Sequence, residues 1–218
     1  EVIHEKYLPI IRKRCVDLVN DEEVEGLLFD YKHFWGDYDH YHNSHGLFIL
    51  EIRMVRNRPD IHSWESAQSF RRIPGFDGKD YRQQEGTYKL KVAHSNAEVY
   101  HYGWVRPPKT MEKKAIALAT IHKGEEKVKE LFAERAPQFD YGDLSKLPHF
   151  EGTHPAVMQN FIQQFDWADQ LRFEGGKPES RPLFKHEKLK YQLMTWVEQN
   201  LAGGKEIGGF HNYVLLDR

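Results

Sequence analysis

The order of the regular segments constrains the fold most strongly, because segments with strand character fill the first half of the chain and helical periodicity fills the second. The strand segments are rich in β-branched and aromatic residues or alternate between apolar and polar positions. They are residues 24–35, 47–56, 87–93 and 97–104. Ser95-Asn96 lies between the last two and predicts a hairpin. Early strands followed by late helices predict an α/β fold with one mixed sheet.

The predicted helices have apolar residues three or four positions apart. One helix precedes most of the strands, and the others follow them. They are residues 8–19, 111–133, 153–167 and 188–201. Pro107-Pro108 separates the two kinds of segment. We therefore expect a sheet domain over residues 1–108 and a helical region over residues 109–218 packed on it.

Composition excludes several classes of protein. Apolar residues make up 39% of the 218 residues, which is enough for a sizeable core. The net charge of −2 gives no electrostatic reason to expect nucleic acid or an anionic membrane as a partner. The sequence has no apolar run long enough for a transmembrane segment. Cys15 is the single cysteine, so an intrachain disulfide is excluded, and we expect a reducing, cytoplasmic location.

The sequence has 13 histidines, and four of them lie close to two aspartates. The group comprises His33, Asp37, Asp39, His40, His42 and His45. On a strand, His40 and His42 would point to one face and could bind a metal together. Residues 36–46 are rich in loop-forming residues, however, and solvated loop histidines are the interpretation that this composition favours.

The segment Tyr-His-Tyr-Gly-Trp-Val-Arg-Pro-Pro at 100–108 offers a second candidate site. A histidine near a strand end, here His101, can bind a metal or donate to a phosphate. Tyr102 and Trp104 could form a stacking wall for a sugar or a base, and Arg106 offers a planar cation to phosphate oxygens. The alternative is a histidine buried in an aromatic core and hydrogen-bonded to a carbonyl.

Two acids are further candidates. Glu1 adjoins an apolar pair at what resembles a strand end, where α/β sheets place ligands. Glu65 follows Trp64, and an acid beside an aromatic ring can serve as a general base. For both residues the alternative is an ordinary solvated carboxylate.

Several strings resemble a bacterial group of family-2-like glycosyltransferases. The most specific are the opening Glu1-Val2-Ile3-His4-Glu5 and the nonapeptide at 100–108. The other matching strings lie at 21–31, 51–57, 67–71, 139–144, 152–157 and 207–209. The resemblance therefore covers nearly the whole chain.

The resemblance implies a GT-A fold, the mixed-sheet fold of nucleotide-diphospho-sugar transferases. It also implies a nucleotide-sugar donor, a saccharide or other acceptor, and a divalent cation, Mn²⁺ or Mg²⁺. Glu1 matches the last acid of the family's metal-binding motif, and His101 matches a position that contacts the metal or the diphosphate. The chain resembles the acceptor side of such an enzyme. We therefore expect the nucleotide-binding half to precede Glu1, and the chain by itself to be inactive and prone to self-association.

The resemblance also suggests the remaining site residues. Relatives have an aspartate just before an Ala-Gln pair, whereas this chain has Ser66 there, next to Glu65. Glu65 and Ser66 are thus the catalytic candidates. Gln68, Tyr102, Trp104 and Arg106 form the predicted substrate-binding set.

Two other functions stay open on the residues alone. One is a metal-dependent hydrolase built on His40 and His42. The other is a non-catalytic carbohydrate-binding domain that uses the aromatic residues.

Overall fold

The computed structural model describes residues 1–65, 69–79, 82–83, 85–133, 136–176, 178, 181–208 and 211–218. The strands are β1 Val2–Ile3, β2 Gly26–Trp35, β3 Tyr41–His42, β4 Leu50–Val55, β5 Ile61–Trp64, β6 Ser69–Arg72, β7 Tyr88–Trp104 and β8 Tyr213–Leu215. The α-helices are α1 Leu8–Leu18, α2 Pro108–Lys123, α3 Glu125–Phe132, α4 Gln159–Gln163 and α5 Leu189–Asn200. Short 3₁₀ turns occupy Glu5–Tyr7, Leu144–Lys146, Ala156–Met158, Ala168–Gln170 and Lys185–Glu187.

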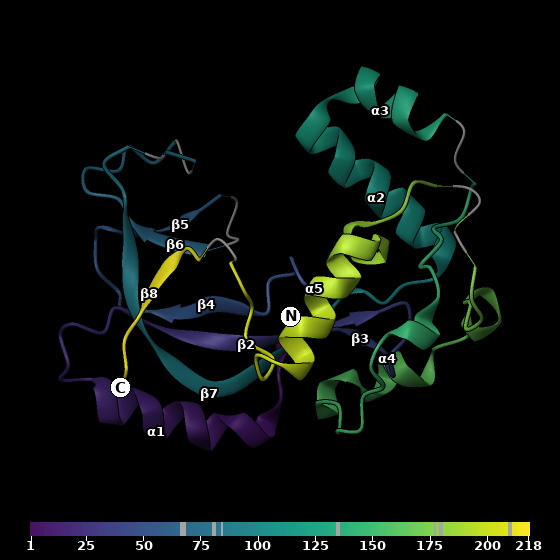
Figure 1. Cartoon of the computed structure of the whole chain (residues 1–218). Coiled ribbons are helices and arrows are strands. Elements are labelled where there is room, and N and C mark those ends of the chain that lie inside the picture. Colours follow the sequence, from purple (N-terminus) through teal and green to yellow (C-terminus); the bar gives the residue numbers. More distant parts are fainter. Residues whose placement is uncertain are drawn as a thin grey trace. The chain divides into compact units, whose positions relative to one another are not determined.

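The described strands form one open sheet of eight strands (Figure 1). Its main path runs β3-β2-β7-β6-β5, while β4 pairs with β2, and β1 and β8 pair with β7. β8 is parallel to β7, whereas β2 is antiparallel to both β3 and β4. The predicted α/β class with a mixed sheet is therefore confirmed.

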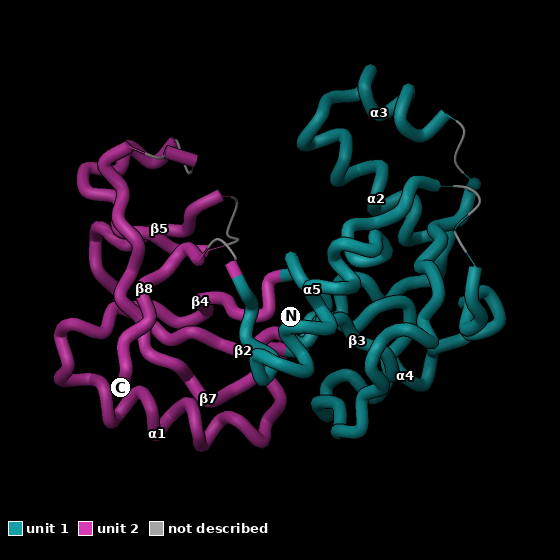
Figure 2. The backbone as a smooth tube through the Cα atoms, viewed as in Figure 1, with its two compact units in different colours: residues 1, 32–47, 100–207 teal, residues 2–31, 48–99, 208–218 magenta. Residues whose placement is uncertain are grey.

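The chain divides into two compact units (Figure 2). Unit 1 comprises residue 1 and residues 32–47 and 100–207. Unit 2 comprises residues 2–31, 48–99 and 208–218. β2 and β7 contribute residues to both units, so neither unit is continuous in sequence. The division after residue 108 stays a prediction.

The hairpin predicted at Ser95-Asn96 is wrong, because residues 88–104 form the single strand β7. The Ala97 amide donates to Ser95 Oγ over 3.2 Å, and Asn96 has a φ of +58°. These two features mark a local irregularity within the strand. Ala93 and Ala97, on either side of it, are both buried in the same core. Burial on both sides keeps the chain in the sheet instead of reversing it.

The long helix predicted over residues 111–133 is also corrected. α2 ends at Lys123 and α3 begins at Glu125, and Gly124 between them has a φ of +83°. Glycine adopts this backbone conformation without steric cost, so the helix breaks there. The helix predicted over 153–167 shrinks to α4, whereas α1 and α5 agree with their predicted ranges.

Each unit has its own apolar core. In unit 2, Ile11 and Leu18 of α1 pack with Phe29 and Val99 of the sheet, and α1 lies along β7 (Figure 1). In unit 1, the core residues are Trp35, Met111, Phe139, Tyr141 and Leu144. The Trp35 indole also donates to the Tyr141 carbonyl over 2.8 Å, which fixes the ring in that core. Among the described residues, no helix has both the length and the apolar character that crossing a bilayer requires.

Candidate functional site

β2 and β7 bring two histidines together in unit 1. The Nδ1 atoms of His33 and His101 lie 3.0 Å apart, and the rings meet edge to face with centroids 5.0 Å apart. One ring must donate its proton to the other for this contact to be a hydrogen bond. The sequence pointed to both histidines separately, but the strand order that pairs them is visible only in the structure.

The opposite face of β7 carries aromatic rings. Tyr102 stacks on Phe34 with centroids 4.8 Å apart and nearly parallel planes. Its hydroxyl forms a 2.8 Å hydrogen bond with His154 Nδ1. Tyr100 is fully buried beside Phe34 and Phe150. Tyr102 thus packs within an aromatic cluster of unit 1, and its contact with a substrate stays a prediction.

The environment of His101 keeps its ring uncharged at neutral pH. Burial, and next the neighbouring His33, lower the pKa of His101 from 6.5 to about 4. Glu1 acts in the opposite direction, so its carboxylate is close enough to interact electrostatically with the ring. A neutral imidazole is the form that binds metal ions.

Gly103 gives the His101 ring its space. A Cβ atom at position 103 would come within 2.5 Å of His101 Nε2 and 2.8 Å of Cε1. Any other residue at position 103 would force the ring or its neighbours to shift. The close neighbour of Gly103 is thus the ring two residues earlier.

One cation lies beside Trp104, and a second acts on it electrostatically. Lys114 of α2 donates to the Gly103 carbonyl, and its Nζ lies 5.4 Å from the Trp104 ring centroid. Burial, and next the positive Arg106, lower the pKa of Lys114. Arg106 itself is exposed, while its carbonyl accepts a hydrogen bond from the Tyr141 hydroxyl. Lys114 was missed because Lys109, Lys113 and Lys123 lie on the same helix, and nothing in the sequence singles out one of the four.

The other predicted residues lie elsewhere. Trp104 packs on Trp35, with centroids 4.8 Å apart, in the core of unit 1. Glu65 belongs to unit 2, where it follows β5 with a φ of +50° and acts electrostatically on Arg71. Ser66 and Gln68 lie outside the described residues. The structure therefore places Glu1, His101, Trp104 and Arg106 in one unit and Glu65 in the other.

The histidines of residues 36–46 are not the solvated loop residues that the composition favoured. His42 is 2% exposed, and its ring lies against His186, with centroids 4.3 Å apart. Burial holds the pKa of His42 well below its usual value. His40 instead contacts Asp37 through Nδ1 over 2.8 Å and packs on His149. Because the two rings have different neighbours, they do not form the metal pair that a regular strand would give.

The donor atoms available for a metal are limited in the described part of the chain. Glu1 offers a carboxylate and His101 a neutral imidazole near it. No group of three or more His, Cys, Asp or Glu side chains among the described residues is arranged to hold a metal ion. Glu1 and His101 are fewer than the ligands that a metal site needs, and their role as metal ligands stays a prediction.

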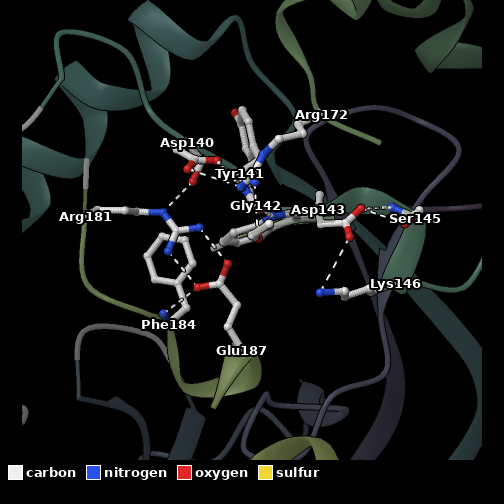
Figure 3. A network of polar contacts seen from close by, with 12 residues as sticks. Asp140, Tyr141, Gly142, Asp143, Ser145, Lys146, Arg172, Arg181, Phe184 and Glu187 are labelled. Carbon is white, nitrogen blue, oxygen red and sulfur yellow. Dashed lines mark hydrogen bonds and ion pairs between the residues drawn. The ribbon is translucent and has the colours of Figure 1, made fainter. Parts of the chain in front are cut away.

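A polar network in unit 1 was not predicted from the sequence (Figure 3). The Arg181 guanidinium binds both carboxylate oxygens of Glu187, over 2.6 and 2.8 Å, and donates to the Asp140 carbonyl. It also stacks on the Phe184 ring, with Arg181 Cζ 3.7 Å from the ring centroid. This network ties residues 181–187 to the loop at Asp140. The sequence did not predict it, because the Asp140 carbonyl lies 41 residues before Arg181 in the chain.

Comparison with protein-family models, with curated proteins and with solved structures gives no match to the chain.

Proposed function

We propose that this chain belongs to a metal-assisted glycosyltransferase of GT-A fold, which transfers a sugar from a nucleotide-sugar donor to a saccharide or other acceptor. The proposal starts from the resemblance carried by the opening residues and the nonapeptide at 100–108. One observation carries it further: Glu1 and His101, the two residues that the resemblance assigns to the metal, belong to one unit and interact electrostatically.

The residues around His101 suit this chemistry. When bound, a divalent cation would offset the negative charge on the departing nucleoside diphosphate. Glu1 and the neutral His101 would hold it. Lys114 and Arg106 would add positive charge for phosphate oxygens beside the flat Trp104 ring.

A general base must take the proton from the acceptor hydroxyl. Glu65, next to the serine that replaces the family's aspartate, is the candidate that the resemblance gives, and as a residue of unit 2 it stays a prediction. Ser66 is not assigned a separate role, because a serine hydroxyl is far less basic than a carboxylate.

The test uses the natural protein that contains this sequence. It is incubated with UDP-, GDP- and dTDP-sugars in Mn²⁺, in Mg²⁺ and in EDTA, and release of nucleoside diphosphate is measured. We expect at least one donor to be cleaved with a divalent cation and none in EDTA. Cleavage that persists in EDTA, or the absence of cleavage of every donor, contradicts the proposal.

A further inference from the structure

Unit 1 contains a pocket of about 790 Å³ at α5, which lies apart from the residues assigned above. Its walls come from α5, from Asn43 and Ser44, from the segment 141–148, and from residues 183–187. Small-molecule sites in proteins usually span roughly 300–1,000 Å³. The pocket therefore has the capacity for an organic ligand of more than one ring.

An exposed aromatic ring forms part of the wall. Trp196 of α5 is 55% exposed although its ring is large and apolar, and Leu189 beside it on the pocket wall is also exposed. The face of an indole ring is electron-rich, and the C–H groups on one face of a pyranose are apolar and weakly positive. Such a sugar face and the indole can stack.

Side-chain amides along the pocket are held in fixed orientations. Gln192 Nε2 donates to the Glu187 carbonyl, Gln199 Nε2 to the Asn43 carbonyl, and Asn200 Nδ2 to the Trp196 carbonyl. The amide nitrogens are thus engaged within the protein, and the amide oxygens are directed away from those bonds as acceptors. Sugar hydroxyls are donors that match acceptors of this kind.

The charges on the pocket wall compensate each other (Figure 3). Lys146 Nζ lies 3.6 Å from Asp143, and Glu187 is paired with Arg181. His186, on the same wall, has a pKa lowered to about 4, chiefly by burial, and is uncharged at neutral pH. A ligand with a phosphate or carboxylate would have to compete with an existing ion pair, whereas a neutral ligand would not.

We infer that this pocket binds a neutral saccharide, stacked on Trp196 and hydrogen-bonded by the amides of α5 and by His186.

Binding is tested by saturation-transfer NMR in EDTA and without nucleotide. The probes are neutral trisaccharides of glucose, galactose, mannose and N-acetylglucosamine, with trigalacturonic acid and mannose 6-phosphate as anionic probes. At least one neutral trisaccharide should bind. Trp196→Ala should lower the affinity for it about tenfold or more, as loss of an aromatic anchor does. The matched control is Phe161→Ala, because Phe161 is 56% exposed on α4 and outside the pocket wall.

Binding of the anionic probes alone, binding of no probe, or equal weakening by both substitutions would overturn the inference. The donor-cleavage test distinguishes failure of this inference from failure of the proposed function. Saccharide binding by a protein that cleaves no nucleotide-sugar contradicts the transferase alone. Donor cleavage by a protein that binds no neutral saccharide contradicts the pocket assignment alone.

Discussion

The facing Nδ1 atoms of His33 and His101 lie 3.0 Å apart, within hydrogen-bond distance. A hydrogen bond there uses one proton, and a second proton would leave two N–H donors facing each other on a positively charged pair. The pair therefore makes the folded state sensitive to acid.

The first prediction concerns this pH dependence. The pKa of His101, and that of His186, is about 4 in the folded chain, against an ordinary 6.5. Between these values the unfolded chain binds more protons than the folded one, so stability falls as pH drops from about 6.5 to about 4. Each histidine should account for about 1–3 kcal/mol of that loss. Urea unfolding across this range measures it, and His101→Gln should flatten the curve. A curve with the same slope in the variant contradicts the assignment.

The second prediction concerns Gly103. Gly103→Ala places a methyl group 2.5 Å from His101 Nε2, so the ring or its neighbours must shift. Such overpacking should cost about 1–3 kcal/mol in the free energy of unfolding. Gly175→Ala is the control, since its Cβ would only reach ordinary contact, 3.8 Å from Asp143. Equal effects of the two substitutions in chemical denaturation would show that the close contact is unimportant.

The third prediction concerns Glu198 of α5, whose side chain is buried. Its Oε1 receives the Ile207 amide and contacts His45 Nδ1, each over 2.7 Å. Glu198→Ala leaves both groups without their acceptor and should cost about 3 kcal/mol or more. Asp17→Ala, which breaks the exposed pair with Lys13, should cost less than about 1 kcal/mol. Melting temperatures of the two variants compare the losses, and a similar small loss for both would contradict the role given to Glu198.

The fourth prediction concerns Arg181, whose side chain is 4% exposed. Arg181→Lys keeps the charge but loses the two-pronged bond to Glu187 and the stack on Phe184. We expect a loss of about 2–4 kcal/mol, because the carboxylate keeps only part of its hydrogen bonding. Arg172→Lys, where the contacts to Asp140 are 3.4 Å long, should change stability by less than about 1 kcal/mol. An unchanged unfolding midpoint for Arg181→Lys would contradict this prediction.

Local patterns predicted the α/β class, the mixed sheet, α1 and α5, since each depends on periodicity within a short stretch. They failed at Ser95-Asn96, where burial on both sides overrides the turn propensity of the two residues. They also failed at Gly124, where one residue divides a continuous helical pattern.

The sequence predicted some residues of the candidate site, but it did not predict which residues they contact. His101 was selected from the sequence, whereas its contact with His33 depends on the order of strands in the sheet. The bond from Arg181 to the Asp140 carbonyl and the pocket at Trp196 depend on how loops from distant parts of unit 1 fold together. No local spacing encodes such contacts.

The central claim is that His101 contacts the metal or the donor diphosphate. It is tested most directly by the rate of nucleotide-sugar cleavage per folded molecule in His101→Ala and His33→Ala, made in the natural protein. The two substitutions remove the same hydrogen bond and should lower stability similarly. The account predicts that His33→Ala, which removes a hydrogen-bond partner of the metal contact, loses about 10- to 100-fold of the metal-dependent rate, and that His101→Ala, which removes the contact itself, loses more. Equal rates for the two variants would contradict it and leave the histidine pair a structural feature only.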